Sequence, residues 1–220
     1  MRFLNTLFAI LIVGLASCSS EGEGTNNNVE SKEVKSETTE LSIPDGMYAL
    51  TKVEPTVTWV AKKFTGSGHN GTINATIGKM KVENGNISGS VELDMNSFTC
   101  TDLEGEDKQH FDDHLKSADF LDVEVYPTSE VSILGIKGEN GNLKASISLR
   151  MHGHDVQYET AITITHTELE DGSMTYVISG DLEIDRTKHK MIYGSGSFFD
   201  DLGDRAINDE VYIRFTFTAV

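Results

Sequence analysis

Two pairs of histidines could bind a metal ion. His110 and His114 are four residues apart, so they share one face of the helix expected around them, and aspartates flank both. His152 and His154 form a second pair, and imidazole with carboxylate is a common zinc ligand set. No third ligand at a fixed spacing accompanies either pair, and aspartates near a helix start are ordinary because of the helix dipole. A metal site on His110 and His114 is therefore the alternative hypothesis, and we expect no metal.

Other groups of catalytic type lack the partners that chemistry would need. The carboxylate pair Asp112-Asp113 is not accompanied by a nucleophile elbow, an oxyanion pattern or a row of sugar-binding aromatics. The segment from Gly66 to Gly71 matches G-x-G-x-x-G, but a strand pattern follows it, whereas phosphate binding needs a helix N-terminus there. We read the aspartates as solvated charges and expect a protein that is not an enzyme and has no cofactor.

Cys18 is the residue with the most specific chemistry in the sequence. It follows an apolar run at residues 7–16 (LFAILIVGLA), which is too short to span a bilayer and typical of a signal-peptide core. The string Leu15-Ala16-Ser17-Cys18 resembles the lipobox of bacterial lipoproteins, in which the signal is cut before a cysteine that becomes lipidated. This resemblance implies a signal peptide at residues 1–17, a lipid on Cys18 and a location in the bacterial cell envelope, at the outer membrane or its periplasmic face, with surface exposure left open.

Residues 18–45 are polar and acidic and almost free of aromatics. Such a segment cannot bury enough apolar surface to offset its ordering entropy, so it is predicted to be a disordered tether. The whole chain carries a formal charge of −17, which excludes a nucleic-acid partner and electrostatic docking on anionic lipid. The predicted membrane contact is therefore the acyl anchor alone.

Residues 46–220 show the alternation of half-buried antiparallel strands. In the runs around Val91, Ile147 and Phe215, apolar and polar residues alternate, so each predicted strand has one dry and one wet face. The pairs Asn84-Gly85 and Asn140-Gly141 separate such runs and favour tight hairpin turns. Eight or nine strands in sequence with one helix predict an all-β domain, either an up-and-down barrel or a sandwich.

Two local patterns refine this prediction. The apolar parity of Ile73, Ala75 and Ile77 flips across Gly78, which predicts a bulge there. Thr101, with Glu104 three residues on, resembles a capping box, so a helix is expected to begin there, to end near Lys116 and to lie across the barrel or its mouth.

The segment from His114 to Pro127 (HLKSADFLDVEVYP) resembles the signature of the YceI-like family, departing at Leu121, where a second Phe is usual. Supporting resemblances are the stretch from Phe64 to Ile73, residues 91–102, and Ile184-Asp185-Arg186. The resemblance covers residues 47–220 and implies a lipocalin-like antiparallel barrel whose lumen holds a polyisoprenoid or similar lipid. By the same analogy Arg186 would form a partly buried ion pair with Asp185.

An eight-stranded barrel is wide enough to be filled by side chains or to hold one slim ligand, and the sequence alone does not choose between these. With the resemblance, we predict a lumen that binds an apolar lipid chain through eleven residues: Val57, Trp59, Ile73, Val91, Leu93, Phe98, Phe111, Leu115, Phe120, Ile147 and Ile162. The predicted function is an envelope-anchored carrier or reservoir of an isoprenoid or similar chain. The alternative is an envelope metal-binding or stress-response binding protein that uses the helix carrying His110 and His114. A homodimer stays open, and Cys100 is expected to be a small buried thiol.

Overall fold

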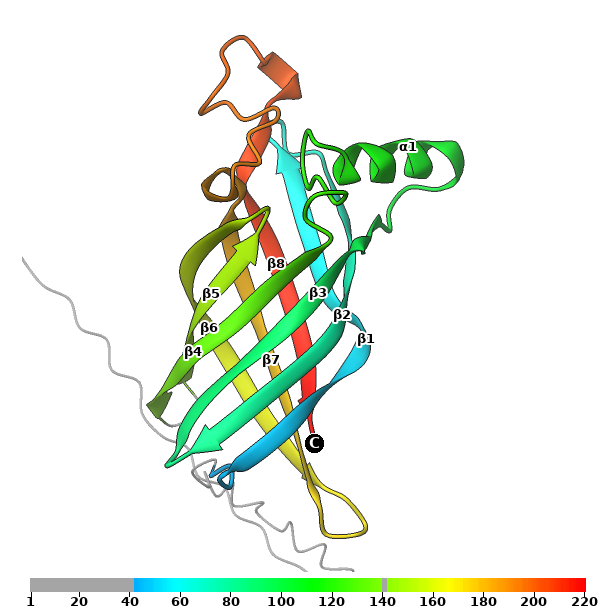
Figure 1. The fold of residues 1–220 in the computed structure, drawn as a ribbon. Coiled ribbons are helices and arrows are strands. Elements are labelled where there is room, and N and C mark those ends of the chain that lie inside the picture. The colour runs from blue at the N-terminus through cyan, green and yellow to red at the C-terminus, as the bar shows by residue number, and fades with distance from the viewer. Residues whose placement is uncertain (1–41, 140–141) are drawn as a thin grey trace, which may run out of the picture. The chain divides into compact units, whose positions relative to one another are not determined.

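The computed structural model describes residues 42–139 and 142–220, and these form one closed antiparallel barrel in which each strand pairs with the next and β8 returns to β1 (Figure 1). The up-and-down barrel is therefore confirmed. The signal peptide 1–17, Cys18 and most of the predicted tether lie outside the described residues. The strands are β1 (Gly46–Lys63), β2 (Gly68–Glu83), β3 (Asn86–Cys100), β4 (Thr128–Glu139), β5 (Asn142–Met151), β6 (His154–Glu168), β7 (Met174–Asp185) and β8 (Ile207–Ala219).

Strand alternation places the apolar residues inside the barrel. In β3, Val91, Leu93 and Met95 are 1%, 6% and 2% exposed, while Glu92 between them is exposed. The same rule holds in β5, where Ala145, Ile147 and Leu149 are buried. All of these inward residues belong to one hydrophobic core that runs along the barrel.

The predicted turn at Asn84-Gly85 is confirmed, because both residues have positive φ (51° and 74°), as a type I′ hairpin turn requires. Asn140-Gly141 lies outside the described residues. The predicted bulge exists but lies before Gly78, between Ala75 and Ile77. Ile77 is consequently 71% exposed, so its expected place on the inner face with Ala75 was wrong.

The one α-helix among the described residues, α1 (Gly105–Lys116), ends where it was predicted but begins later. Its N-cap residue is Glu104, which makes no side-chain capping bond. Thr101 instead extends the β2–β3 ladder, because its N–H donates to the Asn70 carbonyl at 2.9 Å and its hydroxyl to the Asn70 side chain at 2.8 Å. The capping-box prediction was therefore wrong, because the backbone and side chain of Thr101 are hydrogen-bonded to Asn70 of β2 and do not cap the helix.

The packed domain begins slightly before the predicted boundary at residue 46. Ile43 is 7% exposed and belongs to the hydrophobic core. The Tyr48 hydroxyl donates to the Pro44 carbonyl at 2.8 Å and holds this entry segment on the barrel. Among the described residues, no helix is long and apolar enough to cross a membrane.

The two ends of the barrel differ. At one end lie α1, residues 117–127 and the connection 186–206, which contains the short 3₁₀ helices η1 (Arg186–His189) and η2 (Gly203–Arg205) (Figure 1). We call this the α1 end. At the opposite end lie the β2–β3 and β6–β7 hairpin turns and the C-terminus, and the rings of Tyr48 and Tyr176 meet edge to face there with centroids 5.7 Å apart. The interior between the two ends is the candidate site.

Candidate ligand-binding site

The barrel interior contains a cavity of about 90 Å³ to which all eight strands contribute. Every lining residue is aliphatic or aromatic, because the inward position of each strand alternation is apolar. The lining consists of Leu50, Val57, Ile73, Val91, Leu93, Val131, Ile133, Ile136, Ala145, Ile147, Leu149, Met151, Ile162, Ile178, Leu182, Ile184, Ile213, Phe215 and Phe217. Such a wall offers no hydrogen bond or charge and can only take an apolar group.

Phe215 occupies much of the space beside this cavity. Gly180 faces it from β7, and a Cβ added at Gly180 would lie 2.6 Å from the Phe215 ring. The rings of Phe215 and Phe217 are neighbours on β8, with centroids 6.0 Å apart. Typical ligand pockets measure about 300–1,000 Å³, so side chains fill most of this lumen in the structure.

Six of the eleven predicted lumen residues line the cavity: Val57, Ile73, Val91, Leu93, Ile147 and Ile162. Trp59 and Phe98 do not. They stack on each other with ring centroids 4.7 Å apart and fill the barrel toward the α1 end. Contact of any of these residues with a ligand stays a prediction.

The remaining three predicted residues, Phe111, Leu115 and Phe120, lie at the α1 end and not in the cavity. All three are partly buried against the core. Phe120 forms an aromatic cluster with His114 and Tyr193, whose ring centroid lies 4.9 Å from each of theirs. The His114 Nε2 lies 3.0 Å from an Asp119 carboxylate oxygen. This cluster covers the α1 end of the lumen.

The family-like segment after the helix folds into the cover of this end. Its backbone turns back on itself, with Asp122 N–H donating to the Ser117 carbonyl at 2.8 Å and Val123 N–H to the Lys116 carbonyl at 3.0 Å. The turn buries Leu121, which is 6% exposed. The position where a second Phe is usual therefore keeps its apolar role.

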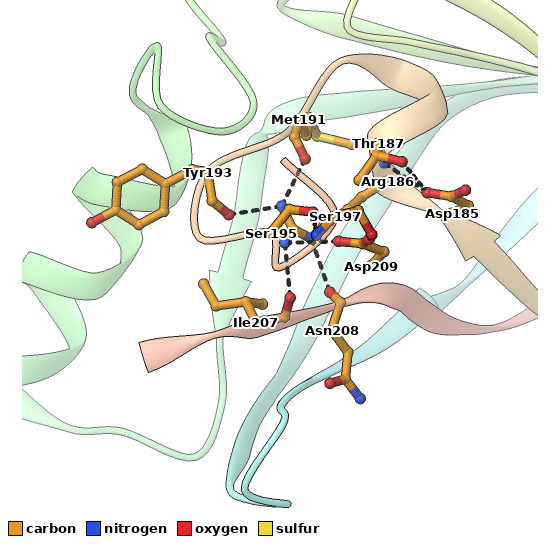
Figure 2. Close-up of polar contacts among 10 residues, drawn as sticks. All are labelled: Asp185, Arg186, Thr187, Met191, Tyr193, Ser195, Ser197, Ile207, Asn208 and Asp209. Atoms are coloured by element: carbon orange, nitrogen blue, oxygen red, sulfur yellow. Dashed lines mark hydrogen bonds and ion pairs between the residues drawn. The ribbon is translucent and has the colours of Figure 1, made fainter. Parts of the chain in front are cut away.

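Arg186 organises the other half of the cover (Figure 2). Its side chain is 4% exposed and lies 3.4 Å from the Asp209 carboxylate. The predicted pair with Asp185 was wrong, because Asp185 instead accepts hydrogen bonds from the N–H and hydroxyl of Thr187 at 2.9 and 2.6 Å. The guanidinium also donates to the carbonyls of Asn208 (2.9 Å), Met191 (2.7 Å), Tyr193 (2.9 Å) and Ile207 (3.1 Å).

A second buried network fixes η1 to the strands below. His189 is fully buried, and its Nδ1–H donates to the His154 carbonyl at 3.1 Å. Its Nε2 is then the acceptor for the Tyr158 hydroxyl, also at 3.1 Å. Burial lowers the pKa of His189 more than its backbone hydrogen bonds raise it, so the ring stays neutral. The His152 side chain also has a structural role, because its Nδ1–H donates to the His189 carbonyl at 3.1 Å, whereas His154 contributes its backbone carbonyl to this network.

The alternative hypothesis, a metal site on His110 and His114, is not matched by the geometry of the described residues. Within residues 42–139 and 142–220, a single group of three potential ligands converges, and it contains His69, Cys100 and Asp102 rather than His110 or His114. Asp112 is also not the solvated charge expected from sequence. It accepts from the Thr99 hydroxyl at 2.6 Å and the Cys100 N–H at 2.7 Å, and so fixes α1 to β3.

These features define a class of protein: a closed eight-stranded antiparallel barrel with an apolar interior and a covered end. The chain matches the YceI-like domain family over residues 48–219 and belongs to this family. The family resemblance of the segment from His114 to Pro127 is thereby confirmed. No curated protein matches the chain.

Solved structures share the fold at low sequence identity. The crystal structure of Burkholderia cenocepacia BcnA is similar at 22% identity and a TM-score of 0.56, over 74% of this chain and 95% of that one. A polyisoprenoid-binding domain from Saccharophagus degradans, implicated in plant cell wall breakdown, is similar at 13% identity and a TM-score of 0.53, over 78% and 97%. The Campylobacter jejuni YceI protein has 14% identity and a TM-score of 0.51, over 90% and 97%.

Proposed function

We propose that the barrel binds one elongated apolar chain, an isoprenoid or a similar long-chain lipid, and does no chemistry on it. The observation that carries this proposal is the cavity whose wall, built from all eight strands, is wholly apolar. A polar or charged ligand would lose its hydration there without compensation. The polyisoprenoid-binding domain with the same fold supports this choice of ligand.

The energetics favour a long chain over a short one. Burial contributes about 0.8 kcal/mol per methylene, so ten methylenes give about 8 kcal/mol. Association itself costs about 4–15 kcal/mol. A short acyl chain therefore gains little, whereas a chain of several isoprene units gains a clear surplus.

A chain of that length requires the lumen to widen beyond about 90 Å³. Phe215 is the side chain to move, since its ring rests against the space left by Gly180. The wall beside it is irregular, because the register of β1 against β8 shifts between Lys52 and Val57. We propose that the ligand displaces the Phe215 ring and that the β1 irregularity lets the wall adjust.

The proposed location is the bacterial cell envelope, where Cys18 anchors the chain and the barrel acts as a carrier or reservoir. Several acyl chains on one residue give stable anchoring, whereas one chain gives marginal binding. The formal charge of the whole chain, −17, disfavours contact of the protein with anionic headgroups. Mass spectrometry of the N-terminal peptide of the natively purified protein should show a chain that begins at Cys18 and carries acyl groups, and Cys18→Ser should abolish both the cut and the acyl mass; an unmodified Cys18 in the wild type would contradict the anchor.

The ligand proposal is tested by organic extraction of the natively purified full chain and mass spectrometry of the extract. Ala145 lines the cavity, and Ala145→Phe should fill it. Ala161→Phe adds the same ring on the outer face, where Ala161 is exposed, and is the matched control. We expect one long-chain lipid per chain in the wild type and in Ala161→Phe, and at least a tenfold loss in Ala145→Phe. Equal recovery from all three, or no lipid from the wild type, would refute the proposal.

A further inference from the structure

Three residues of metal-ligand type meet where β2 begins and β3 ends. His69, Cys100 and Asp102 each offer one ligand atom, and these atoms lie within 4.8 Å of one another. Sheet pairing brings them together. Gly71 is the register partner of Cys100, and the ladder continues through the hydrogen bond from Thr101 N–H to the Asn70 carbonyl, so His69 lies across from Asp102. Residues two apart on paired strands share one face of the sheet.

The fourth position of this face is Gly71, where the Thr99 carbonyl oxygen and the Trp59 ring take up the place of a side chain. A Cβ on Gly71 would lie 1.9 Å from the Thr99 carbonyl oxygen and 2.5 Å from the Trp59 ring, so only glycine fits. Cys100 is fully buried below this point, whereas the side chains of His69 and Asp102 are 33% and 30% exposed. The cluster therefore has a soft sulfur ligand inside and an open side toward water.

The His69 ring is already fixed in place. It packs against Phe111 of α1 with ring centroids 4.3 Å apart, and its Nδ1 lies 3.3 Å from both carboxylate oxygens of Asp102. The Cys100 thiol donates to Asp102 Oδ1 at 2.6 Å. Three ligand atoms are thus oriented toward one another before any ion is bound.

We propose that His69 Nδ1, Cys100 Sγ and one Asp102 carboxylate oxygen bind a divalent transition metal ion of the zinc type, with water as the fourth ligand. Sulfur, imidazole and carboxylate together suit zinc, and three protein ligands leave an open position. Zinc lies about 2.0 Å from nitrogen and oxygen ligands and about 2.3 Å from sulfur. In a tetrahedral site these bond lengths place nitrogen about 3.3 Å from oxygen and sulfur about 3.5 Å from oxygen. The nitrogen–oxygen separation already has this length, and the partly exposed Asp102 side chain needs to withdraw from the thiol by about 0.9 Å.

Binding exchanges a proton for the ion. Because sulfur binds as the thiolate, the proton that Cys100 now donates to Asp102 leaves to solvent, and one proton is released per ion. The site lies at the edge of the barrel and shares none of its three ligands with the apolar lumen lining. A failure of the lipid proposal would therefore not affect the metal-site proposal, and the reverse also holds.

The test uses the full chain carrying Cys18→Ser, so that Cys100 is the only thiol, kept reduced by a reductant without sulfur and stripped by a chelator. Titration with Co²⁺ should give one equivalent bound, a thiolate-to-cobalt charge-transfer band in the near ultraviolet, and one proton released per ion. Zn²⁺ should displace the cobalt and abolish the band. Binding without that band would show that Cys100 is not a ligand and would overturn the proposal.

Variants separate this site from the helix histidines. Cys100→Ser and His69→Gln should each weaken Zn²⁺ binding by at least about 100-fold, since even outer-sphere changes cost 10–100-fold. His110→Gln removes an exposed histidine and should leave the affinity unchanged. Circular dichroism of each variant checks that the barrel is folded. Loss of binding in His110→Gln, or wild-type affinity in Cys100→Ser, would refute the assignment.

Discussion

Replacement of Arg186 by Met should destabilise the barrel strongly. The Arg186 guanidinium is a nearly inaccessible charge, and five oxygen acceptors surround it. The guanidinium bonds four backbone carbonyls at 2.7–3.1 Å and lies 3.4 Å from Asp209. Met has a similar length but donates nothing. The variant leaves the Asp209 carboxylate, itself only 18% exposed, without its cation.

The expected loss is about 3–5 kcal/mol, the range for breaking a buried ion pair by removing one partner. With a urea m-value of about 2 kcal/mol/M, the unfolding midpoint should fall by about 2 M. Arg186→Lys keeps the charge but offers three donors without the planar fork, so its midpoint should lie between those of wild type and Arg186→Met.

The assay is urea unfolding followed by the fluorescence of Trp59, the single tryptophan, which is 2% exposed in the folded barrel. Arg214→Met is the matched control, because Arg214 is 73% exposed where it pairs with Asp181. We expect no resolvable change in that variant. A loss below about 1 kcal/mol for Arg186→Met would refute the reasoning, because it would mean that the carbonyls find other donors.

Three further predictions concern packing and pH. Gly71→Ala should lower the free energy of unfolding in urea by about 3 kcal/mol or more, because the added Cβ would lie 1.9 Å from the Thr99 carbonyl oxygen. Gly135→Ala is the control, since a Cβ there has no atom within 4 Å, and it should lower the free energy of unfolding far less. Equal losses in the two variants would contradict the close approach at Gly71. Burial raises the pKa of Tyr158 to about 12. The stabilisation by the neutral Tyr158 hydroxyl is therefore complete below pH 10 and is lost as pH rises toward 12. Absorbance of the Tyr158 phenolate that titrates at the free value of 10.0 would contradict the raised pKa. Burial lowers the pKa of His189 below 6.5, so the stabilisation by the neutral ring is complete above pH 6.5 and is lost as pH falls. In His189→Gln the free energy of unfolding should therefore fall less steeply on acidification than in the wild type. An equally steep fall would exclude His189 as the group responsible.

The sequence predicts the strands well because burial imposes a period of two on them. Val91, Ile147 and Phe215 lie on inner faces as their alternation requires. The alternation cannot fix register, however. A uniform ladder from the Asn84-Gly85 turn would pair His69 with Cys100, but two register shifts place Gly71 there instead. The convergence of His69, Cys100 and Asp102 therefore could not be derived from spacing alone.

Local motifs mislead where distant groups compete for the same atoms. Thr101 has the sequence context of a capping residue, yet the Asn70 backbone pairs with it first. Arg186 is next to Asp185 in sequence, but its ion-pair partner is Asp209, 23 residues away. In both cases the outcome depends on which strand lies alongside, and short sequence windows contain no information about that.

The size of the lumen depends on packing that a pattern of residue types does not specify. The small residue Gly180 suggests interior space, but Phe215 from the neighbouring strand occupies that space. Five of the predicted lumen residues lie instead toward the α1 end, because the strands and the helix carry them past the cavity. The sequence predicts that aromatic residues lie in or near the lumen. It does not predict which of them line the cavity and which lie at the α1 end.

A crystal structure of the natively purified protein tests the central claim most directly. The account predicts continuous, elongated electron density along the barrel axis between Val91 and Ile147, with the Phe215 ring turned away from Gly180. A lumen without such density, in which Phe215 still covers Gly180 and side chains fill the interior, would contradict the claim that this barrel holds a lipid chain.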